Sequence, residues 1–181
     1  MNSAENFYNN LAPLKSIGRA YMGETRYKAA QGQLGRVIAA RLLPRTDLVE
    51  GIEKICEDYE IKYAFVNCSI GSLEKATFMI VAPKPEAKIK AGYTTPFELP
   101  GPIEFLGGHG IVCKGTNGER ETHFHGVISD QFNHVYGGHF VKGKNPILAT
   151  VDLIISEVKG VKLLRKYDEE TDLINFAPEP E

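Results

Sequence analysis

The sequence predicts an α+β fold, in which a mostly antiparallel β-sheet packs with one or two helices in a single domain. From residue 62 onward, Val, Ile, Thr and aromatic residues recur in short runs that are typical of strands. Eighteen glycines and the Asn117-Gly118 pair supply tight turns between such runs. Helical periodicity is clearest in residues 46–60. The length of 181 residues suits one domain with its own core.

The first two elements are a strand and a helix. Residues 36–44 form an apolar run that ends at Pro44 and predicts a buried strand. The helix begins after Asp47, which forms a capping-box pattern with Glu50. Its buried stripe and its solvated face are each predicted from helical spacing. The stripe comprises Leu48, Ile52, Ile55 and Tyr59, and the solvated face comprises Glu50, Lys54, Glu57 and Asp58.

The remaining elements are predicted to be strands, giving a sheet of about six to eight strands. The strand-like runs are residues 62–71, 75–83, 103–115, 119–130, 134–140 and 146–158. A polar loop with prolines is expected at 84–96, and a strong hairpin turn at Asn117-Gly118. We divide the chain into an N-terminal segment (1–34, partly loose or packed on the body), the main domain (35–160) and a partly loose acidic C-terminal tail (161–181).

Charge and cysteine content restrict the function classes. Lys and Arg number 21 against 23 Asp and Glu, for a net charge of −2, whereas domains that grip DNA phosphates usually carry a basic excess. The three cysteines are scattered and are expected to be free thiols. The opening residues have no apolar run typical of a signal peptide, and no run approaches the roughly 20 residues of a membrane helix. We expect a cytoplasmic protein without a membrane partner.

Four of the five histidines lie between Thr122 and Phe140. Side chains at i and i+2 of a strand share a face, so His123 and His125 point the same way. If the chain folds back around Phe132, His139 lies directly across from His125, where facing Cβ atoms are roughly 5 Å apart. Three imidazoles then converge on one face of a hairpin.

Three imidazoles suit zinc or another divalent metal, and leave a further coordination position for water or a ligand. His123, His125 and His139 are therefore the candidate metal ligands. The alternative is that these histidines only pack, because a one-residue slip in register would move His139 to the other face. His134 has the wrong parity and is expected to be exposed. His109 is expected to pack, or else to line the same cavity or a subunit contact.

A few charged residues are candidates for a role beside such a metal site. Glu104, Glu121 and Asp130 are the nearby carboxylates in sequence that could orient a metal-bound imidazole. Glu104 is also a candidate general base. Arg41, or Arg36, could bind the carboxylate of a small-molecule ligand, although each is also a plausible surface residue.

Several motifs of the chain resemble the PPC family, the domain shared by plants and prokaryotes. They are RLLPRTDL, GSLEKATF, IEFLGGHGI and HFHGVISDQFNHVYGGHF, spread between about Arg36 and Val158. The resemblance implies a trimeric α+β domain with His123, His125 and His139 as metal ligands, and a DNA-binding role. Arg45 stands where family members often have glycine. The AT-hook of plant members is missing here, so its DNA contacts do not carry over.

The expected fold is also similar to that of acetolactate decarboxylase, a zinc enzyme with a histidine tripod. Three function hypotheses stay open. The first is a trimeric zinc-binding PPC protein with a regulatory or DNA-associated role. The second is a zinc-dependent enzyme, lyase-like or hydrolase-like, that acts on a small carbonyl or carboxylate metabolite. The third is an assembly module without chemistry.

Overall fold

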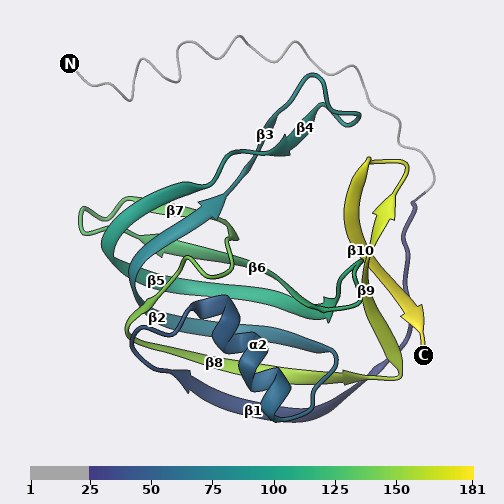
Figure 1. Cartoon of the computed structure of the whole chain (residues 1–181), viewed down its shortest axis with the longest axis horizontal. Coiled ribbons are helices and arrows are strands. Elements are labelled where there is room, and N and C mark those ends of the chain that lie inside the picture. Colours follow the sequence, from purple (N-terminus) through teal and green to yellow (C-terminus); the bar gives the residue numbers. More distant parts are fainter. Residues whose placement is uncertain (1–24) are drawn as a thin grey trace.

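The computed structural model describes residues 25–181, apart from the side chains of Cys68 and Ser69. Residues 1–24, which make up most of the expected N-terminal segment, lie outside the described residues. The described chain contains one α-helix and ten strands (Figure 1). These are β1 (Gln33–Leu42), α2 (Leu48–Asp58), β2 (Ala64–Met79), β3 (Val81–Pro83), β4 (Ala91–Tyr93), β5 (Phe97–Lys114), β6 (Arg120–Ser129), β7 (Val135–Phe140), β8 (Ile147–Lys159), β9 (Val161–Asp168) and β10 (Leu173–Pro180).

Eight strands form one sheet in the order β1-β8-β2-β7-β6-β5-β9-β10, and β2 also pairs with β5. The strands β2, β5, β6 and β7 therefore form a closed ring of pairings, which β7 completes by meeting the end of β2 at Met79↔His139. All pairings are antiparallel except one parallel contact between β5 and β9. The predicted α+β class, with a mostly antiparallel sheet and one helix, is confirmed.

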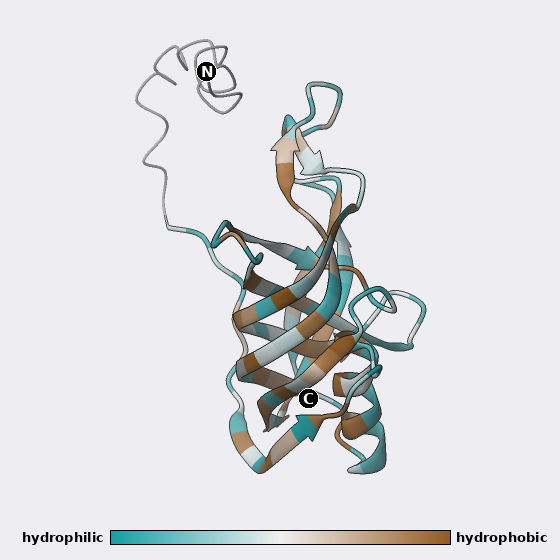
Figure 2. Cartoon of the chain, turned by 90° about the vertical axis from the view of Figure 1, so that its left-hand side faces the viewer, coloured by the Kyte–Doolittle hydropathy of each residue, from teal (hydrophilic) through white to brown (hydrophobic). Residues whose placement is uncertain are grey.

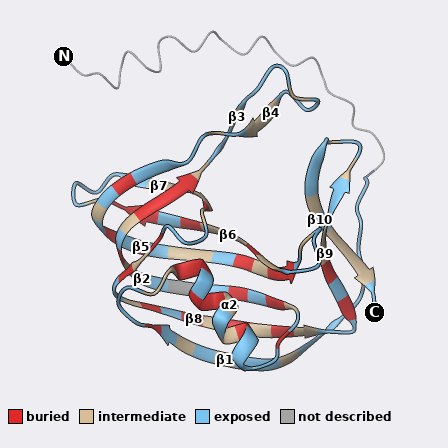
Figure 3. Ribbon diagram, viewed as in Figure 1, coloured by how far each residue is buried: buried red, intermediate tan, exposed pale blue. Residues whose placement is uncertain are grey.

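The core lies between α2 and the inner face of the ring. Four phenylalanines from four strands meet there, with ring centroids 5.8–6.2 Å apart in the pairs that touch; they are Phe78, Phe105, Phe124 and Phe140. Leu48, Ile52 and Cys56 of α2 close the cluster with no exposed surface. Figure 3 shows the buried residues concentrated in α2 and in the strands behind it.

Helix α2 begins as predicted at Asp47, whose carboxylate accepts hydrogen bonds from the backbone N–H groups of Val49 and Glu50 at 3.0 Å. The predicted buried stripe is correct only at its start. Ile55 is half-buried and Tyr59 is 49% exposed, whereas Val49 and Cys56 are buried. The buried face is thus rotated toward Val49, because the helix packs on β6 through that side.

Two strand predictions needed correction. Residues 64–79 form the single strand β2 rather than two strands, because Leu73 lies buried between partners on both neighbouring strands, Ile103 of β5 and Ile147 of β8. Residues 33–42 do form a strand, but β1 is the edge of the sheet. Most of its residues are exposed, so the prediction of a buried strand was wrong.

The C-terminal segment 161–181 was expected to be partly loose, but it forms the β9–β10 hairpin. Its acidic residues build the turn. The Asp168 carboxylate accepts a hydrogen bond from the Glu170 backbone N–H at 2.9 Å, and Asp172 has a left-handed φ of 60°. Arg26 pairs with Glu170 and Lys28 with Asp168, which offsets the negative charge.

A second hairpin, β3–β4, occupies part of the expected 84–96 loop and projects from the body on the other side of a gap from β9–β10 (Figure 1). Apolar residues lie on this hairpin as well as on the body (Figure 2). Val81 is 64% exposed and Tyr93 is 42% exposed. Among the described residues, no helix is long and apolar enough to span a membrane.

Candidate metal centre

The turn between β6 and β7 sets the register of the histidine-bearing strands. The Asp130 carboxylate accepts hydrogen bonds from the backbone N–H groups of Phe132 (2.8 Å) and His134 (2.9 Å), and the Asp130 N–H donates to the His134 carbonyl. Asn133 takes the left-handed φ of 64° that closes the turn. The chain therefore folds back around Phe132, and His139 pairs with His125 as predicted.

Three imidazoles converge on the outer face of the ring. Phe124 points inward and is fully buried, so its neighbours His123 and His125 point outward. The ring nitrogens that His123, His125 and His139 offer lie within 4.8 Å of one another. Nε2 of His123 is 2.9 Å from Nε2 of His125, and the three ring centroids are 4.9–5.3 Å apart. The predicted histidine cluster exists.

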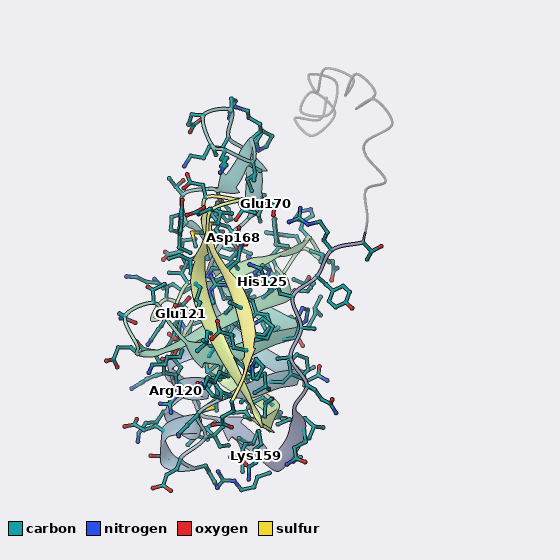
Figure 4. All side chains as sticks on the ribbon, turned by 90° about the vertical axis from the view of Figure 1, so that its right-hand side faces the viewer. Arg120, Glu121, His125, Lys159, Asp168 and Glu170 are labelled. Carbon is teal, nitrogen blue, oxygen red and sulfur yellow. The ribbon has the colours of Figure 1, made fainter. Side chains whose placement is uncertain are left out.

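Arg165 of β9 reaches this cluster from the C-terminal hairpin. Its Nη1 donates to Nδ1 of His123 at 2.6 Å, and its Nε lies 3.2 Å from Oε1 of Glu121. The Nε–Glu121 contact is an ion pair without hydrogen-bond alignment, since the buried Nε has no hydrogen-bond partner among the described residues. The Arg165 side chain is only 13% exposed. In Figure 4 the β9–β10 hairpin lies in front of the labelled Glu121 and His125.

The environment keeps the imidazoles neutral. Burial, then the positive charge of Arg165, lowers the pKa of His123 to about 4. Burial, then the neighbouring His125, lowers the pKa of His139 to about 4, and burial also lowers the pKa of His125. Neutral imidazole is the form that binds metal ions. The electrostatics of the cluster therefore match a metal site better than a cluster of surface charges.

The donor set fits a zinc ion. Nδ1 of His139 is buried and has no hydrogen-bond partner among the described residues, a cost that a ligand would remove. Tetrahedral zinc with Zn–N bonds of about 2.0–2.1 Å sets ligand nitrogens about 3.3 Å apart, so His123 and His125 need only a small separation. Because a guanidinium only donates, Nδ1 of His123 accepts from it and Nε2 carries the proton. A neutral His123 bound through Nε2 would move that proton to Nδ1, so metal binding requires the Arg165–His123 contact to open.

Glu104 is not close to the cluster. It pairs with Ser129, four residues along β6 from His125, which corresponds to about 13 Å. It is exposed on β5. A role as general base stays a prediction that this chain's own geometry does not favour.

The two arginines proposed as carboxylate clamps are also distant. Arg41 pairs with Asp152, which pairs with Ile70 of β2, whereas His139 meets β2 at Met79; nine residues of strand correspond to about 30 Å. Arg36 already binds an internal carboxylate. Its Nε and Nη2 donate to Glu157 at 2.9 and 3.0 Å, and these hydrogen bonds lower the pKa of Glu157 to about 2.

The other two histidines and the other two candidate carboxylates lie in different parts of the structure. His134 is exposed, as expected, and its Nδ1 lies 3.1 Å from Asp130, so Asp130 serves the turn rather than the cluster. Glu121 is the one of the three expected carboxylates that approaches the cluster, through Arg165. His109 is exposed, so it does not pack in the core; it pairs with His125 across β5 and β6 and therefore lies beside the cluster, and a role in a cavity or a subunit contact stays a prediction.

The sequence reasoning missed Arg165 and Tyr93. The ring of Tyr93, from β4, lies 5.2 Å from that of His139. Val161, Leu163 and Arg165 follow the period of two of a strand, and the first two are buried. That alternation could have indicated a strand there, but the acidic residues that follow favoured a loose tail.

A cavity of about 570 Å³ opens beside the cluster, between the two hairpins. Its lining includes His123 and Arg165 as well as the apolar residues Val81, Ile89 and Ile174. Asp172 also faces the cavity, but its carboxylate accepts a hydrogen bond from the Tyr167 hydroxyl at 2.6 Å. His123 thus borders a space whose lining holds both a guanidinium and apolar side chains.

The motifs, the closed sheet and the outward histidines together describe one known domain. The model of the Plants and Prokaryotes Conserved (PCC) domain matches residues 29–159. The chain belongs to this family. The PCC match ends before β9, so Arg165 lies outside it.

Solved structures support the PCC fold. A metal-containing protein from Archaeoglobus fulgidus is 25% identical, with a TM-score of 0.70, and the match covers 83% of this chain and 99% of that one. A plant- and prokaryote-conserved protein from Pyrococcus horikoshii is 24% identical, with a TM-score of 0.67 (81% and 96% covered). A protein from Ralstonia eutropha JMP134, named as a candidate DNA-binding protein, is 20% identical, with a TM-score of 0.62 (77% and 89% covered).

Curated relatives are longer. The PCC chain is 26% identical over 141 residues to the bifunctional protein GlmU of Synechococcus sp. (strain JA-3-3Ab), a match that covers 78% of this chain and 20% of that protein. A GlmU from a second Synechococcus strain is 23% identical over 145 residues. The chain spans about a fifth of the length of these relatives.

Proposed function

We propose that this protein binds a divalent metal ion, zinc in the first instance, through His123, His125 and His139. The observation that carries the proposal is the convergence of three neutral imidazoles within 4.8 Å on a rigid sheet. The fold relative from Archaeoglobus fulgidus is described as metal-containing, which agrees with it. Three protein ligands leave a further position for water or a small molecule.

Metal content per chain tests the proposal. Protein purified without a histidine tag and offered zinc should hold about one ion per chain by elemental mass spectrometry, as one tripod has one site. The His123→Ala/His125→Ala variant should hold none. His134→Ala is the matched control, because it removes an exposed imidazole of the same hairpin. Wild-type protein without metal, or an unchanged double variant, would refute the proposal.

We further propose a homotrimer in the cytoplasm, with a regulatory or DNA-associated role. Two fold relatives are named as candidate DNA-binding proteins. Basic residues also line two further cavities, namely Lys62, Lys114, Arg120 and Lys162. Binding to duplex DNA that weakens steeply with salt, and that weakens further in Lys114→Gln/Lys162→Gln, would support this role. DNA binding that changes neither with salt nor in this double variant would count against the DNA-associated role.

A second candidate function is a zinc-dependent enzyme that acts on a small carbonyl or carboxylate compound. The cavity beside the cluster and the cationic Arg165 favour it. A bound metal would supply a Lewis acid that polarises a carbonyl oxygen. Turnover of small oxo acids that is lost in His125→Ala would support this reading, and a screen without metal-dependent turnover would favour the regulatory one.

A further inference from the structure

We propose that Arg165 makes the cavity beside the histidine cluster a binding site for a small carboxylate with an apolar body, and that Arg165 selects for the carboxylate. The inference rests on the proposed metal site and names the ligand class of that site. Arg165 lies on the C-terminal hairpin, beyond the residues that the PCC model matches.

The position of Arg165 favours an anion at this point. Its guanidinium is 13% exposed, borders the cavity and directly contacts the imidazole of His123. A guanidinium has five N–H donors in a planar fork that matches a carboxylate. Within the described residues, Glu121 and His123 use only the Nε and Nη1 sides, and the Glu121 carboxylate is 44% exposed to solvent.

Metal binding increases the availability of this cation. A neutral His123 that binds metal through Nε2 holds a proton on Nδ1, and a guanidinium cannot accept it. Nη1 of Arg165 would then lose its acceptor. A ligand carboxylate next to the metal is a natural replacement, because it accepts from Arg165 and places its charge near two cations.

The apolar part of the cavity lining sets the rest of the ligand. Val81, Ile89 and Ile174 are 64%, 42% and 44% exposed in the described chain, and all three line the cavity. An apolar body lying on them removes that surface from water. A branched oxo acid therefore fits better than a fully polar dianion such as oxalate.

The test uses the full chain loaded with Co²⁺, whose visible spectrum reports ligands at the metal. The probe is 4-methyl-2-oxopentanoate, and 4-methyl-2-pentanone is the matched compound without a carboxylate. The variants are Arg165→Gln, Arg165→Lys and the control Lys166→Gln, which removes a neighbouring charge that pairs with Glu179 instead. Metal content is measured for each protein.

We expect the oxo acid to shift the spectrum of wild type and Lys166→Gln with equal Kd, and Arg165→Gln to bind it at least tenfold more weakly. Arg165→Lys should lie between, and the ketone should not distinguish Arg165→Gln from wild type. Equal carboxylate affinity in Arg165→Gln, or no binding by wild type, would overturn the inference while the metal site stands. Metal lost only from Arg165→Gln would also overturn it, since Arg165 would then position His123. Wild type without cobalt would instead refute the metal proposal.

Discussion

The guanidinium of Arg165 lies against the imidazole of His123. This contact is stable because the imidazole is neutral. Burial and the guanidinium both lower the pKa of His123, to about 4. His139 has a similarly lowered pKa of about 4, with burial as the main cause. His123 and His139 are thus two half-buried bases that resist protonation, and such perturbed groups cluster at functional sites.

These lowered pKa values predict how the stability of the metal-free protein depends on pH. In the unfolded chain histidine takes up a proton near pH 6.5, but in the folded chain His123 and His139 do so only near pH 4. Between these values the unfolded state binds more protons, so stability falls as pH drops from about 6.5 toward 4.

Urea denaturation at pH 7 and pH 5, with a chelator present, measures this dependence. His139→Gln removes one of the two groups whose pKa falls to about 4 and should clearly reduce the pH-dependent loss. The control His134→Gln, at an exposed imidazole, should leave the loss unchanged. An identical pH dependence in wild type and His139→Gln would contradict the prediction.

At the scale of residues, the sequence predicted the three histidines of the cluster but not Arg165, which contacts His123. His125 and His139 could be paired because strand periodicity and a turn centred on Phe132 are local properties, and Asp130 fixes that turn through its own neighbours. Arg165 lies 42 residues from His123 along the chain. Only the closure of the sheet brings β9 to β5, and no local pattern encodes that contact.

At the scale of elements, β7 holds the site together because it closes the ring against the end of β2. Gly138 makes that approach possible. A Cβ there would lie 2.3 Å from the Met79 carbonyl oxygen, a backbone atom that cannot rotate away. Gly138 therefore serves the closure of the ring between β7 and β2.

Gly138→Ala should lower the free energy of unfolding by about 2–3 kcal/mol, because the β2–β7 pairing must shift to admit the methyl group. The metal affinity should fall as well, since His139 is the next residue on the same strand. The control is Gly92→Ala, whose new Cβ would meet only the flexible side chain of Lys84 at 2.9 Å. Urea denaturation measures both, and a Gly138→Ala protein as stable as Gly92→Ala would show that β7 can move freely.

Two predictions at the scale of elements were wrong, one because of the acidic charge of a segment and one because of the apolar character of another. The acidic stretch after Lys166 was interpreted as loose, yet its carboxylates accept the hydrogen bonds of a turn and pair with Arg26 and Lys28. The apolar run of β1 was interpreted as buried, yet β1 lies at the sheet edge with Val37 61% exposed. An apolar edge strand in one chain is consistent with burial against another.

At the scale of the whole molecule, one face of the sheet carries α2, and the opposite face leaves apolar side chains of β1 and β2 exposed in the described chain. The register places Val37 and Phe65 opposite Ser156 on this outer face. They are 61% and 41% exposed, and Ile154 nearby is half-buried. Contiguous exposed apolar surface of this kind marks protein–protein contacts.

This outer face predicts the contact of the proposed trimer. Light scattering after gel filtration should give about 60 kDa, three times the chain mass of 20.0 kDa. Phe65→Glu should shift the mass toward 20 kDa, because a carboxylate in an apolar contact loses its hydration without a partner. Tyr59→Glu is the control, because Tyr59 caps the C-terminal end of α2, on the other face of the sheet from Phe65, and is 49% exposed. A wild-type mass of 20 kDa would refute the trimer. If Phe65→Glu still forms a trimer, the contact lies on another face, and the two projecting hairpins are the next surfaces to test.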